Sequence, residues 1–301
     1  MRLFITLLLS CLFLSIQAQE YVDLAKFHYQ STGENKFDSS SNSTKIDELS
    51  FNVTLPLKLS EKTAILTGFA IDKYTTDLTE FGDNTSVSSY LLKAGVNINH
   101  NEKWNGTYML LPKLASNFAG DLESDDFQLG AVALLKYQKN PHMRYNIGLY
   151  YNGDRFGTFF VPLLGFYYKK NKFEANLVLP STADANYRIK DNVFIGANFR
   201  AIVKSFNLTQ SFQSLGQEYL GQMSNELFGY VGYEFKNGII LKGQVGYSIG
   251  RSYRVYEKND KIDWGLSAFR FGDDRVPLNS DFADGLLFRA QMVYRFHIDK
   301  D

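Results

Sequence analysis

The C-terminal stretch LFRAQMVYRFHIDKD, residues 287–301, decides which fold class the chain can adopt. From Leu286 to Phe296 every second residue is apolar or aromatic, and the residues between them include Arg289 and Arg295. Period-two alternation of this length predicts a β-strand with one apolar and one charged face. In a soluble sandwich the apolar face would point into the core, whereas in a membrane barrel it would point to lipid and the arginines to a wet interior.

The same alternation recurs along the whole chain, and several apolar faces begin or end on Tyr or Phe. Runs of nine to twelve residues exceed the typical globular strand of about five or six. They match the roughly nine to eleven residues that a tilted strand needs to cross a bilayer, and the terminal rings resemble the aromatic girdles of transmembrane barrels. The clearest runs are ELSFNVTLPLK (48–58), SYLLKAGVNIN (89–99), FQLGAVALLKYQ (127–138), RYNIGLYYN (144–152), LFGYVGYEF (227–235) and GIILKGQVGYSI (238–249).

Connections between these runs alternate in length, as short periplasmic turns and longer extracellular loops do in transmembrane barrels. The short ones, each with a lysine, are 60–63, 99–103, 139–143, 170–172, 190–192 and 236–238, and the long ones are 32–43, 75–88, 115–126, 205–224 and 253–282. Both termini then lie on the short-turn side, which requires an even number of strands. We expect a closed antiparallel up-and-down transmembrane β-barrel. It has fourteen strands if 180–184 is a turn and twelve if 173–190 adds no hairpin, and 261–271 forms a small helix or hairpin in the last loop.

The first residues form a secretory signal peptide, with Arg2, an apolar run and then a small residue at the cleavage point. Cleavage after Ala18 leaves a single barrel domain, residues 19–301. The alternative is an N-terminal membrane anchor, although the run is short for a span. The only cysteine is Cys11, within that run, so we expect a mature protein without disulfides or thiolate metal sites.

Composition and motifs argue against several function classes. Without Arg2 the chain has 31 basic and 32 acidic residues, which does not favour a nucleic-acid partner. We find no nucleophile elbow, nucleotide loop or metal-spaced His/Glu cluster, so the sequence predicts no cofactor, no metal and no catalytic residue. Of the four histidines, only His28 is expected to face the lumen away from the short turns, and no serine or aspartate partner for it is evident.

The signal-like end QAQ (17–19), the hairpins and the last strand AQMVYRF (290–296) together resemble outer-membrane β-barrels of Bacteroidota-type bacteria. More narrowly, the chain resembles a barrel family of that group known only as a domain of unknown function. The resemblance implies the outer membrane of a Gram-negative bacterium. It also implies contact with outer-membrane lipid, lipopolysaccharide and the barrel-insertion machinery, although HIDKD (297–301) extends beyond the usual terminal aromatic residue. The insertion signal maps onto Met292, Tyr294 and Phe296.

The polar faces of the predicted strands carry more basic than acidic residues. These charges either pair across a closed lumen or line a wet pore that favours small anionic solutes. A barrel of twelve to fourteen strands lies between those that are filled by side chains and those that hold an aqueous channel. The lumen-lining candidates are Lys93, Lys136, Arg144, Arg200, Lys242, Arg289, Arg295, Glu48, Glu174 and Glu234.

Three functional hypotheses follow from the sequence. The first is a porin-like outer-membrane barrel without enzymatic activity that passes or binds small solutes, anionic ones included, or has a structural role in the envelope. The second is an outer-membrane barrel enzyme with His28 as its only candidate base. The third is a secreted soluble β-sandwich that acts as a binding protein.

Overall fold

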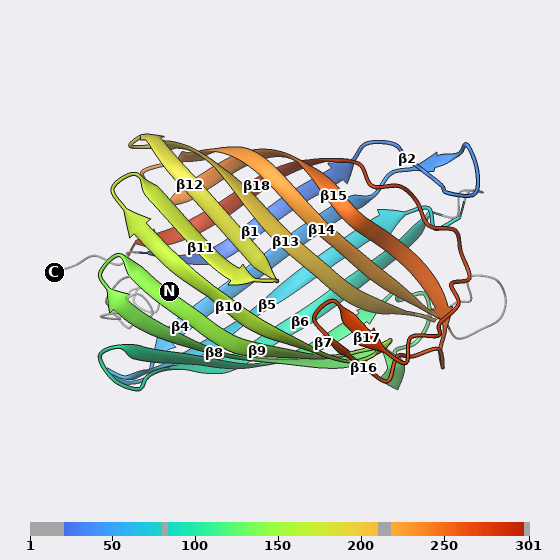
Figure 1. Ribbon diagram of the computed structural model, residues 1–301, viewed down its shortest axis with the longest axis horizontal. Helices are drawn as coiled ribbons and strands as arrows, with labels where there is room; N and C mark the ends of the chain where they lie inside the picture. The colour runs from blue at the N-terminus through green and yellow to red at the C-terminus, as the bar shows by residue number, and fades with distance from the viewer. Residues whose placement is uncertain (1–20, 80–83, 210–217, 298–301) are drawn as a thin grey trace, which may run out of the picture.

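Fourteen antiparallel strands form a closed barrel in the computed structural model (Figure 1). The structure describes residues 21–79, 84–209 and 218–297, so the predicted signal peptide and Cys11 lie outside the described residues. Neighbouring strands pair in chain order, the first and last strands lie side by side, and a β10–β11 ladder completes the ring. The predicted fold class is confirmed, with the higher of the two strand numbers.

Most barrel strands are long, but two neighbouring strands are much shorter than the rest. The wall consists of β1 (Tyr21–Thr32), β4 (Asp47–Lys58), β5 (Thr63–Thr76), β6 (Thr85–Asn99), β7 (Trp104–Ser116), β8 (Phe127–Asn140), β9 (Met143–Asp154), β10 (Gly157–Lys170), β11 (Phe173–Leu179), β12 (Thr182–Lys190), β13 (Val193–Leu208), β14 (Glu218–Glu234), β15 (Ile239–Glu257) and β18 (Leu286–His297).

Several short secondary-structure elements lie in the loops at the long-loop end of the barrel. The first loop contains the hairpin of β2 (Asn35–Lys36) and β3 (Ser43–Thr44), and a single helical turn, η1 (Ser124–Asp126), precedes β8. In the last loop, β16 (Trp264–Leu266) and β17 (Phe269–Phe271) form a hairpin, which decides between the helix and the hairpin expected there. In the part of the chain that the structure describes, no helix has the length and apolarity needed to span a membrane.

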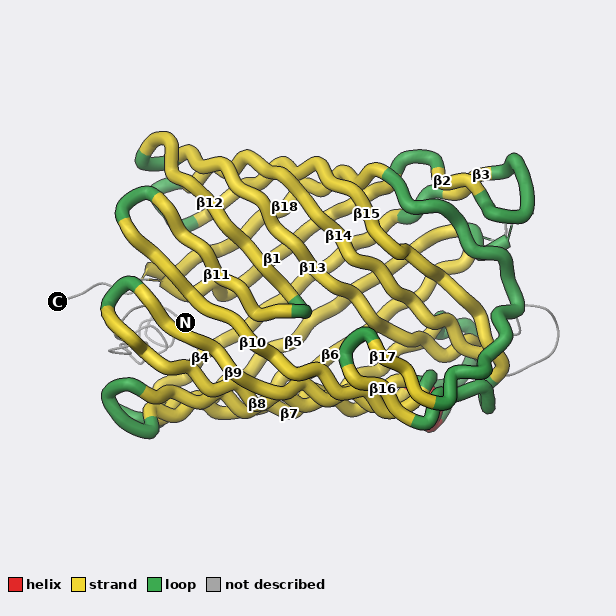
Figure 2. The backbone as a smooth tube through the Cα atoms, in the orientation of Figure 1, coloured by secondary structure: helices red, strands yellow, loops and turns green. Residues whose placement is uncertain are grey.

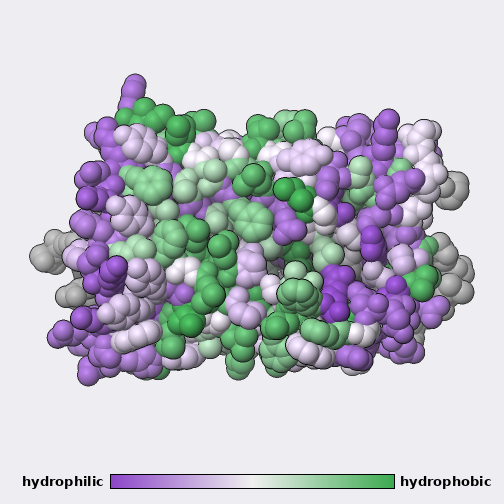
Figure 3. Space-filling view, viewed as in Figure 1, coloured by the Kyte–Doolittle hydropathy of each residue, from purple (hydrophilic) through white to green (hydrophobic). Residues whose placement is uncertain are grey.

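The outer surface carries a broad apolar belt between two hydrophilic ends (Figure 3). Leu92, Leu164 and Val231 are 61%, 59% and 57% exposed, whereas their neighbours in the strands alternate toward the interior. Because side chains alternate across a strand, one apolar stripe on each strand becomes one continuous belt when the sheet closes. Contiguous exposed apolar surface of this kind marks a surface that another apolar phase covers.

The outward direction of the stripes excludes the β-sandwich. Two stacked sheets would bury these side chains against each other, but here they surround a cylinder with a polar lining.

The turn of the shortest hairpin contains the proline at which the sequence predicts a possible turn. Pro180 and Ser181 join β11 to β12 partway along the wall, well short of the long-loop rim (Figure 2).

The long-loop half of β13 folds inward instead of continuing along the wall. Ser205 and Asn207 lie on the outward side of β13 by alternation, yet both are buried. Ser205 Oγ donates to Asp154 Oδ1 over 3.1 Å, and Asn207 Nδ2 donates to Asp126 Oδ1 over 2.9 Å. A parallel bridge joins Asn207 to Ser116 of β7. The outward side of β13 therefore lies against elements from another part of the ring, so this segment crosses the barrel interior.

β14 and β15 follow β13 inward, and strand pairing continues into segments that the sequence predicts as loops. Polar residues there pair with the opposite wall rather than with water, which is why local sequence composition resembles that of a loop. We call the inward-folded part the flap: residues 202–208, 218–223 and 252–257.

A β-bulge marks the bend in β15. The β14–β15 register shifts between Met223 and Asn225, and Gly250 adopts φ 64°. The Gly250 and Arg251 amides donate to the two carboxylate oxygens of Asp284 over 2.7 and 2.8 Å. A bulge bends its strand and is commonly built on a glycine in the left-handed region.

The flap covers an apolar cluster that closes the long-loop end of the lumen. Phe206 and Leu208 of the flap pack there with residues of five other barrel strands and three loops. The mouth cluster consists of Phe37, Ile46, Tyr74, Leu78, Val87, Ala115, Phe206, Leu208, Leu220, Tyr253, Val255 and Phe282.

Replacing Gly250 tests the bend. We expect Gly250→Ala to lower the free energy of unfolding by about 1 kcal/mol, because a Cβ is disfavoured at a positive φ. Gly229→Ala is the matched control, since a Cβ at Gly229 meets no atom within 4 Å and no positive φ is required there. Denaturant unfolding in lipid vesicles measures both variants, and equal effects would contradict the assigned bend.

Candidate functional site

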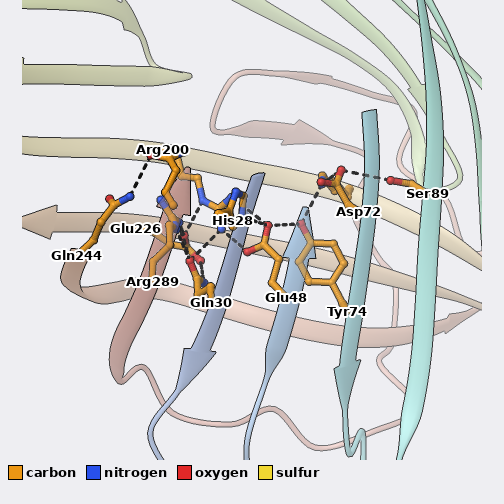
Figure 4. Close-up of polar contacts among 12 residues, drawn as sticks. His28, Gln30, Glu48, Asp72, Tyr74, Ser89, Arg200, Glu226, Gln244 and Arg289 are labelled. Atoms are coloured by element: carbon orange, nitrogen blue, oxygen red, sulfur yellow. Dashed lines mark hydrogen bonds and ion pairs between the residues drawn. The ribbon is translucent and has the colours of Figure 1, made fainter. Parts of the chain in front are cut away.

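A buried network of charged side chains joins β13 and β14 to β18, β1 and β4 across the lumen (Figure 4). Arg200 of β13 donates from Nη1 to Glu48 Oε1 over 3.0 Å and from Nε to Glu226 Oε2 over 2.6 Å. Its Nη2 also contacts Glu48. Arg289 of β18 donates to Glu226 Oε2 over 2.8 Å. Because β4 and β13 lie far apart in the ring, the Arg200–Glu48 contact crosses the lumen.

One amide side chain, Gln30, and one imidazole side chain, His28, complete the network. Gln30 donates from Nε2 to Glu226 Oε1 over 3.0 Å and accepts from Arg289 Nε over 2.9 Å. His28 contacts Glu48 over 3.1 Å. We call these residues the septum: His28, Gln30, Glu48, Arg200, Glu226 and Arg289.

The septum is compensated in charge. Two guanidinium groups face two carboxylates, and Glu48 and Glu226 are 2% and 3% exposed. Buried charges are tolerated only when they are paired and hydrogen-bonded. The septum therefore crosses the lumen between β13 and β4 and carries no excess charge.

A second group extends the septum toward the mouth cluster. Lys204 donates to Asp72 Oδ2 over 2.7 Å and to the Tyr74 hydroxyl over 2.9 Å, and Tyr74 donates to Glu48 Oε1 over 3.1 Å. Since Tyr74 also belongs to the mouth cluster, the polar and apolar closures form one continuous structure.

His28, the only candidate base from the sequence, is enclosed in the septum. It is 8% exposed, and its carboxylate partner, Glu48, also contacts Arg200 and Tyr74. A catalytic base needs access to a substrate proton, whereas His28 lies within the septum. The described residues also contain no group of three or more His, Cys, Asp or Glu side chains that could hold a metal ion.

The short-turn end is hollow, in contrast to the closed long-loop end. One cavity of about 1080 Å³ is lined by Glu174, Glu234 and Arg295 among others. A second, of about 670 Å³, is lined by Lys136, Arg144 and turn residues of β6–β7. Both contain residues of the short turns, so we refer to them together as the vestibule.

The predicted lumen residues differ in their partners. Arg295 pairs with Asp23 over 2.7 Å, and Lys242 lies 3.9 Å from Asp184 and 4.4 Å from the centre of the Tyr230 ring. Glu174 accepts a hydrogen bond from Tyr21. Glu234 pairs with Arg188 over 2.6 Å, and Arg200, Arg289 and Glu48 meet in the septum.

Three of the predicted basic residues have no carboxylate partner among the described residues. Lys93 donates to Asn52 and Thr54 over 2.6 Å each. Arg144 lies 5.0 Å from the centre of the Tyr167 ring, and its buried Nε has no hydrogen-bond partner in the described structure. Lys136, on the strand next to Arg144, lines the same cavity. The vestibule wall between β8 and β9 is therefore positively charged.

Sequence reasoning did not name two of the six septum residues as candidates. Gln30 and Glu226 occupy inward positions in the alternation of β1 and β14, and that position was the available signal. Their partners could not be deduced, because contacts across the lumen do not follow from sequence separation.

The residues assigned to the insertion signal lie on β18. Met292 and Tyr294 lie on its outward face and are each 44% exposed, and Phe296 is half-buried.

Comparison with known proteins identifies the family of the chain and finds distantly similar barrel structures. A family model described as Domain of unknown function (DUF6268) matches residues 14–262. No curated protein matches the sequence. Similar solved structures include the COG4313 outer membrane channel from Pseudomonas putida F1, with 9% identity, 94% of this chain and 98% of that chain covered, and a TM-score of 0.45.

Two further structures are similar at the same level. The toluene transporter TodX from Pseudomonas putida has 9% identity, 91% of this chain and 90% of that chain covered, and a TM-score of 0.39. The translocator domain of the autotransporter NalP from Neisseria meningitidis has 12% identity, 91% and 89% covered, and a TM-score of 0.34. Similarity at this level does not define a function.

Removing one charge tests the septum. We expect Arg200→Ala to lower the free energy of unfolding by about 3–5 kcal/mol, because Glu48 and Glu226 would remain buried without their shared partner. Arg188→Ala is the control: it removes an ion pair to Glu234 from a more exposed rim position, and we expect a loss of at most about 1 kcal/mol. Equal losses in denaturant unfolding would contradict the septum's role.

Proposed function

The chain belongs to the DUF6268 family, and we propose that it is an integral outer-membrane β-barrel without enzymatic activity whose lumen binds small anionic solutes from the short-turn side. The apolar belt supports a membrane location, since leaving it in water would cost about 25 cal/mol per Å² of apolar surface. The sequence features of a signal peptide support export. In this orientation the short turns face the periplasm, and outer-membrane lipid and lipopolysaccharide surround the belt and the long loops.

Binding rather than free diffusion is favoured by the closure of the lumen. The mouth cluster fills the long-loop end, and the septum joins opposite walls below it. An open porin needs a continuous aqueous path, whereas here the vestibule ends at the septum. This arrangement favours the filled-lumen alternative over the wet pore.

The observation that carries the anionic preference is the unpaired positive wall of the vestibule. Lys136 and Arg144 line one cavity from adjacent strands without a carboxylate partner among the described residues. Two cations held close together in a partly enclosed site attract a carboxylate or phosphate more strongly than exposed ones do.

Calorimetric titration of the purified protein with citrate tests this preference. We expect Lys136→Gln/Arg144→Gln to weaken citrate binding by about tenfold or more, which corresponds to about 1.4 kcal/mol. The control is Lys36→Gln/Lys45→Gln, an equal change in charge at the long-loop end, which we expect to bind as the wild type does. An equal loss in both double variants, or wild-type protein that does not bind citrate, would contradict the anion site.

Planar-bilayer recording tests the closed lumen separately. The septum and mouth cluster predict no steady current through the wild-type protein at moderate voltage. A stable open-channel current would show that the closure is not the resting state and would favour a diffusion channel instead.

The terminal strand provides a further test. We propose that Phe296, with Met292 and Tyr294, is read by the barrel-insertion machinery. Phe296→Ala should therefore reduce the folded barrel in the membrane fraction several-fold, measured by the gel mobility of unboiled samples. Tyr187→Ala, which removes an exposed aromatic ring from β12, is the control and should leave the yield unchanged. Equal yields from both variants would contradict the assignment.

A further inference from the structure

The barrel wall has a seam beside the shortest hairpin. β11 ends at Leu179 and β12 begins at Thr182, whereas β10 and β13 continue toward the long-loop end on either side (Figure 1). Among the described strands, residues 161–163 of β10 pair only with β9, and residues 202–206 of β13 pair only with β14. Two strand edges therefore face each other without a ladder between them.

Unpaired strand edges are not left exposed to hydrocarbon, because backbone groups there have no water to bind. The hairpin of β16 and β17 covers part of the seam (Figure 2). β16 pairs in parallel with Thr158–Phe160, and the Ser267 amide donates to the Phe160 carbonyl over 2.8 Å. β10 also carries Pro162, which has no amide proton to leave unpaired.

Next to the β16–β17 hairpin the seam contains a pocket of about 750 Å³, which we call the seam pocket. This volume falls within the range of about 300–1,000 Å³ typical of small-molecule sites. One side is the inner face of β10, the other is β13 with the neighbouring part of β14, and the turn at Pro180 and Ser181 forms its floor. The apolar side chains that line it include Phe159, Val161, Leu163, Ile202, Val203 and Met223.

The seam pocket also has a charged end. Arg200, Lys204 and Arg270 line it together with a single carboxylate, Asp273. Arg275 donates from Nε to Asp273 over 2.7 Å, and this hydrogen bond holds the pKa of the Asp273 carboxyl below its ordinary value. Arg200 and Lys204 are themselves ion-paired with Glu48, Glu226 and Asp72. Arg270 Nη1 lies 3.5 Å from the Asp273 carboxylate that Arg275 also contacts. Because two arginines share this one carboxylate, one positive charge remains uncompensated at the Arg270 end of the pocket.

The floor of the seam pocket lies at the height of the apolar belt. Leu164 and Leu179, which flank its floor on the outer surface, are 59% and 44% exposed. A molecule entering here would come from the hydrocarbon of the membrane and would not pass through the closed mouth of the barrel.

We propose that the seam pocket binds an amphipathic molecule taken sideways from the membrane, with its hydrocarbon chain between β10 and β13 and its anionic group toward Arg270. This inference rests on the membrane location in the proposed function, but it is independent of the vestibule. Apolar walls with a few convergent polar groups at one end fit this class of ligand.

Photolabelling tests the proposal with a defined probe, a palmitic acid that carries a diazirine in its chain. The full-length barrel in lipid nanodiscs would be irradiated with the probe, and labelled peptides identified by mass spectrometry. We expect labelling concentrated on β10, β13 and the β16–β17 hairpin. Unlabelled palmitic acid should displace it, and the uncharged hexadecanol should displace it several-fold less well.

A matched pair of variants separates the pocket from the belt. Ala201 lines the seam pocket, whereas Ala197 lies four residues earlier on the outward face of the same strand. Ala201→Trp should reduce labelling of the pocket by about tenfold, because the larger side chain occupies the space of the hydrocarbon chain. Ala197→Trp should leave it within about twofold of wild type. Unboiled gel mobility confirms that both variants fold.

The pattern of labelling also distinguishes the two proposals. Even labelling around the belt, or equal labelling of the two tryptophan variants, would overturn the seam pocket while the membrane location stands. Equal displacement by palmitic acid and hexadecanol would overturn the role of the anionic group. Labelling that avoids the belt altogether would overturn the membrane location and the seam pocket with it.

Discussion

Closure of the hydrogen-bonded sheet is the constraint on which the rest of the structure depends. In hydrocarbon each backbone amide and carbonyl must find a partner within the protein, and a sheet achieves this only by joining its first edge to its last. The β10–β11 ladder completes that ring, and β1 pairs with β18 within it. Once the ring is closed, period-two alternation sends the apolar residues outward and the charged residues into the lumen.

The short β11–β12 hairpin interrupts this closure, and the main irregular features lie next to it. On the long-loop side of that hairpin, β13, β14 and β15 leave the wall as the flap, which turns inward at the Gly250 bulge. The flap supplies Phe206 and Leu208 to the mouth cluster, and its departure from the wall leaves the seam. One shortened hairpin thus explains both the closed long-loop end and the pocket in the wall.

The fold was predictable because its signal is local and repeated. Alternation placed Arg289 and Arg200 on inward faces, and the hairpin at 264–271 was one of two expected forms. The inward path of β13 was not predictable. Ser205 and Asn207 look like loop residues until Asp154 and Asp126 are seen beside them, from strands and loops far away in the chain.

The candidate site, like the fold, was predictable from the sequence only in part. The excess of basic residues was visible in the sequence, but which of them are neutralised depends on contacts across the lumen. Arg200 meets Glu48 and Glu226, whereas Lys136 and Arg144 keep their charge without a carboxylate partner in the described part of the chain. Identical residue types on inward faces therefore divide into a neutral septum and a positive vestibule.

Site-directed spin labelling along β18 tests the central claim, that the apolar stripes face lipid around a closed cylinder. The only native cysteine is Cys11, so single cysteines can be introduced from Phe288 to Tyr294 in the protein reconstituted in vesicles. The account predicts that labels at Phe288, Ala290, Met292 and Tyr294 are accessible to oxygen dissolved in lipid, and that labels at the alternate positions are not. Accessibility without this period of two, or stripes shielded from lipid, would contradict it.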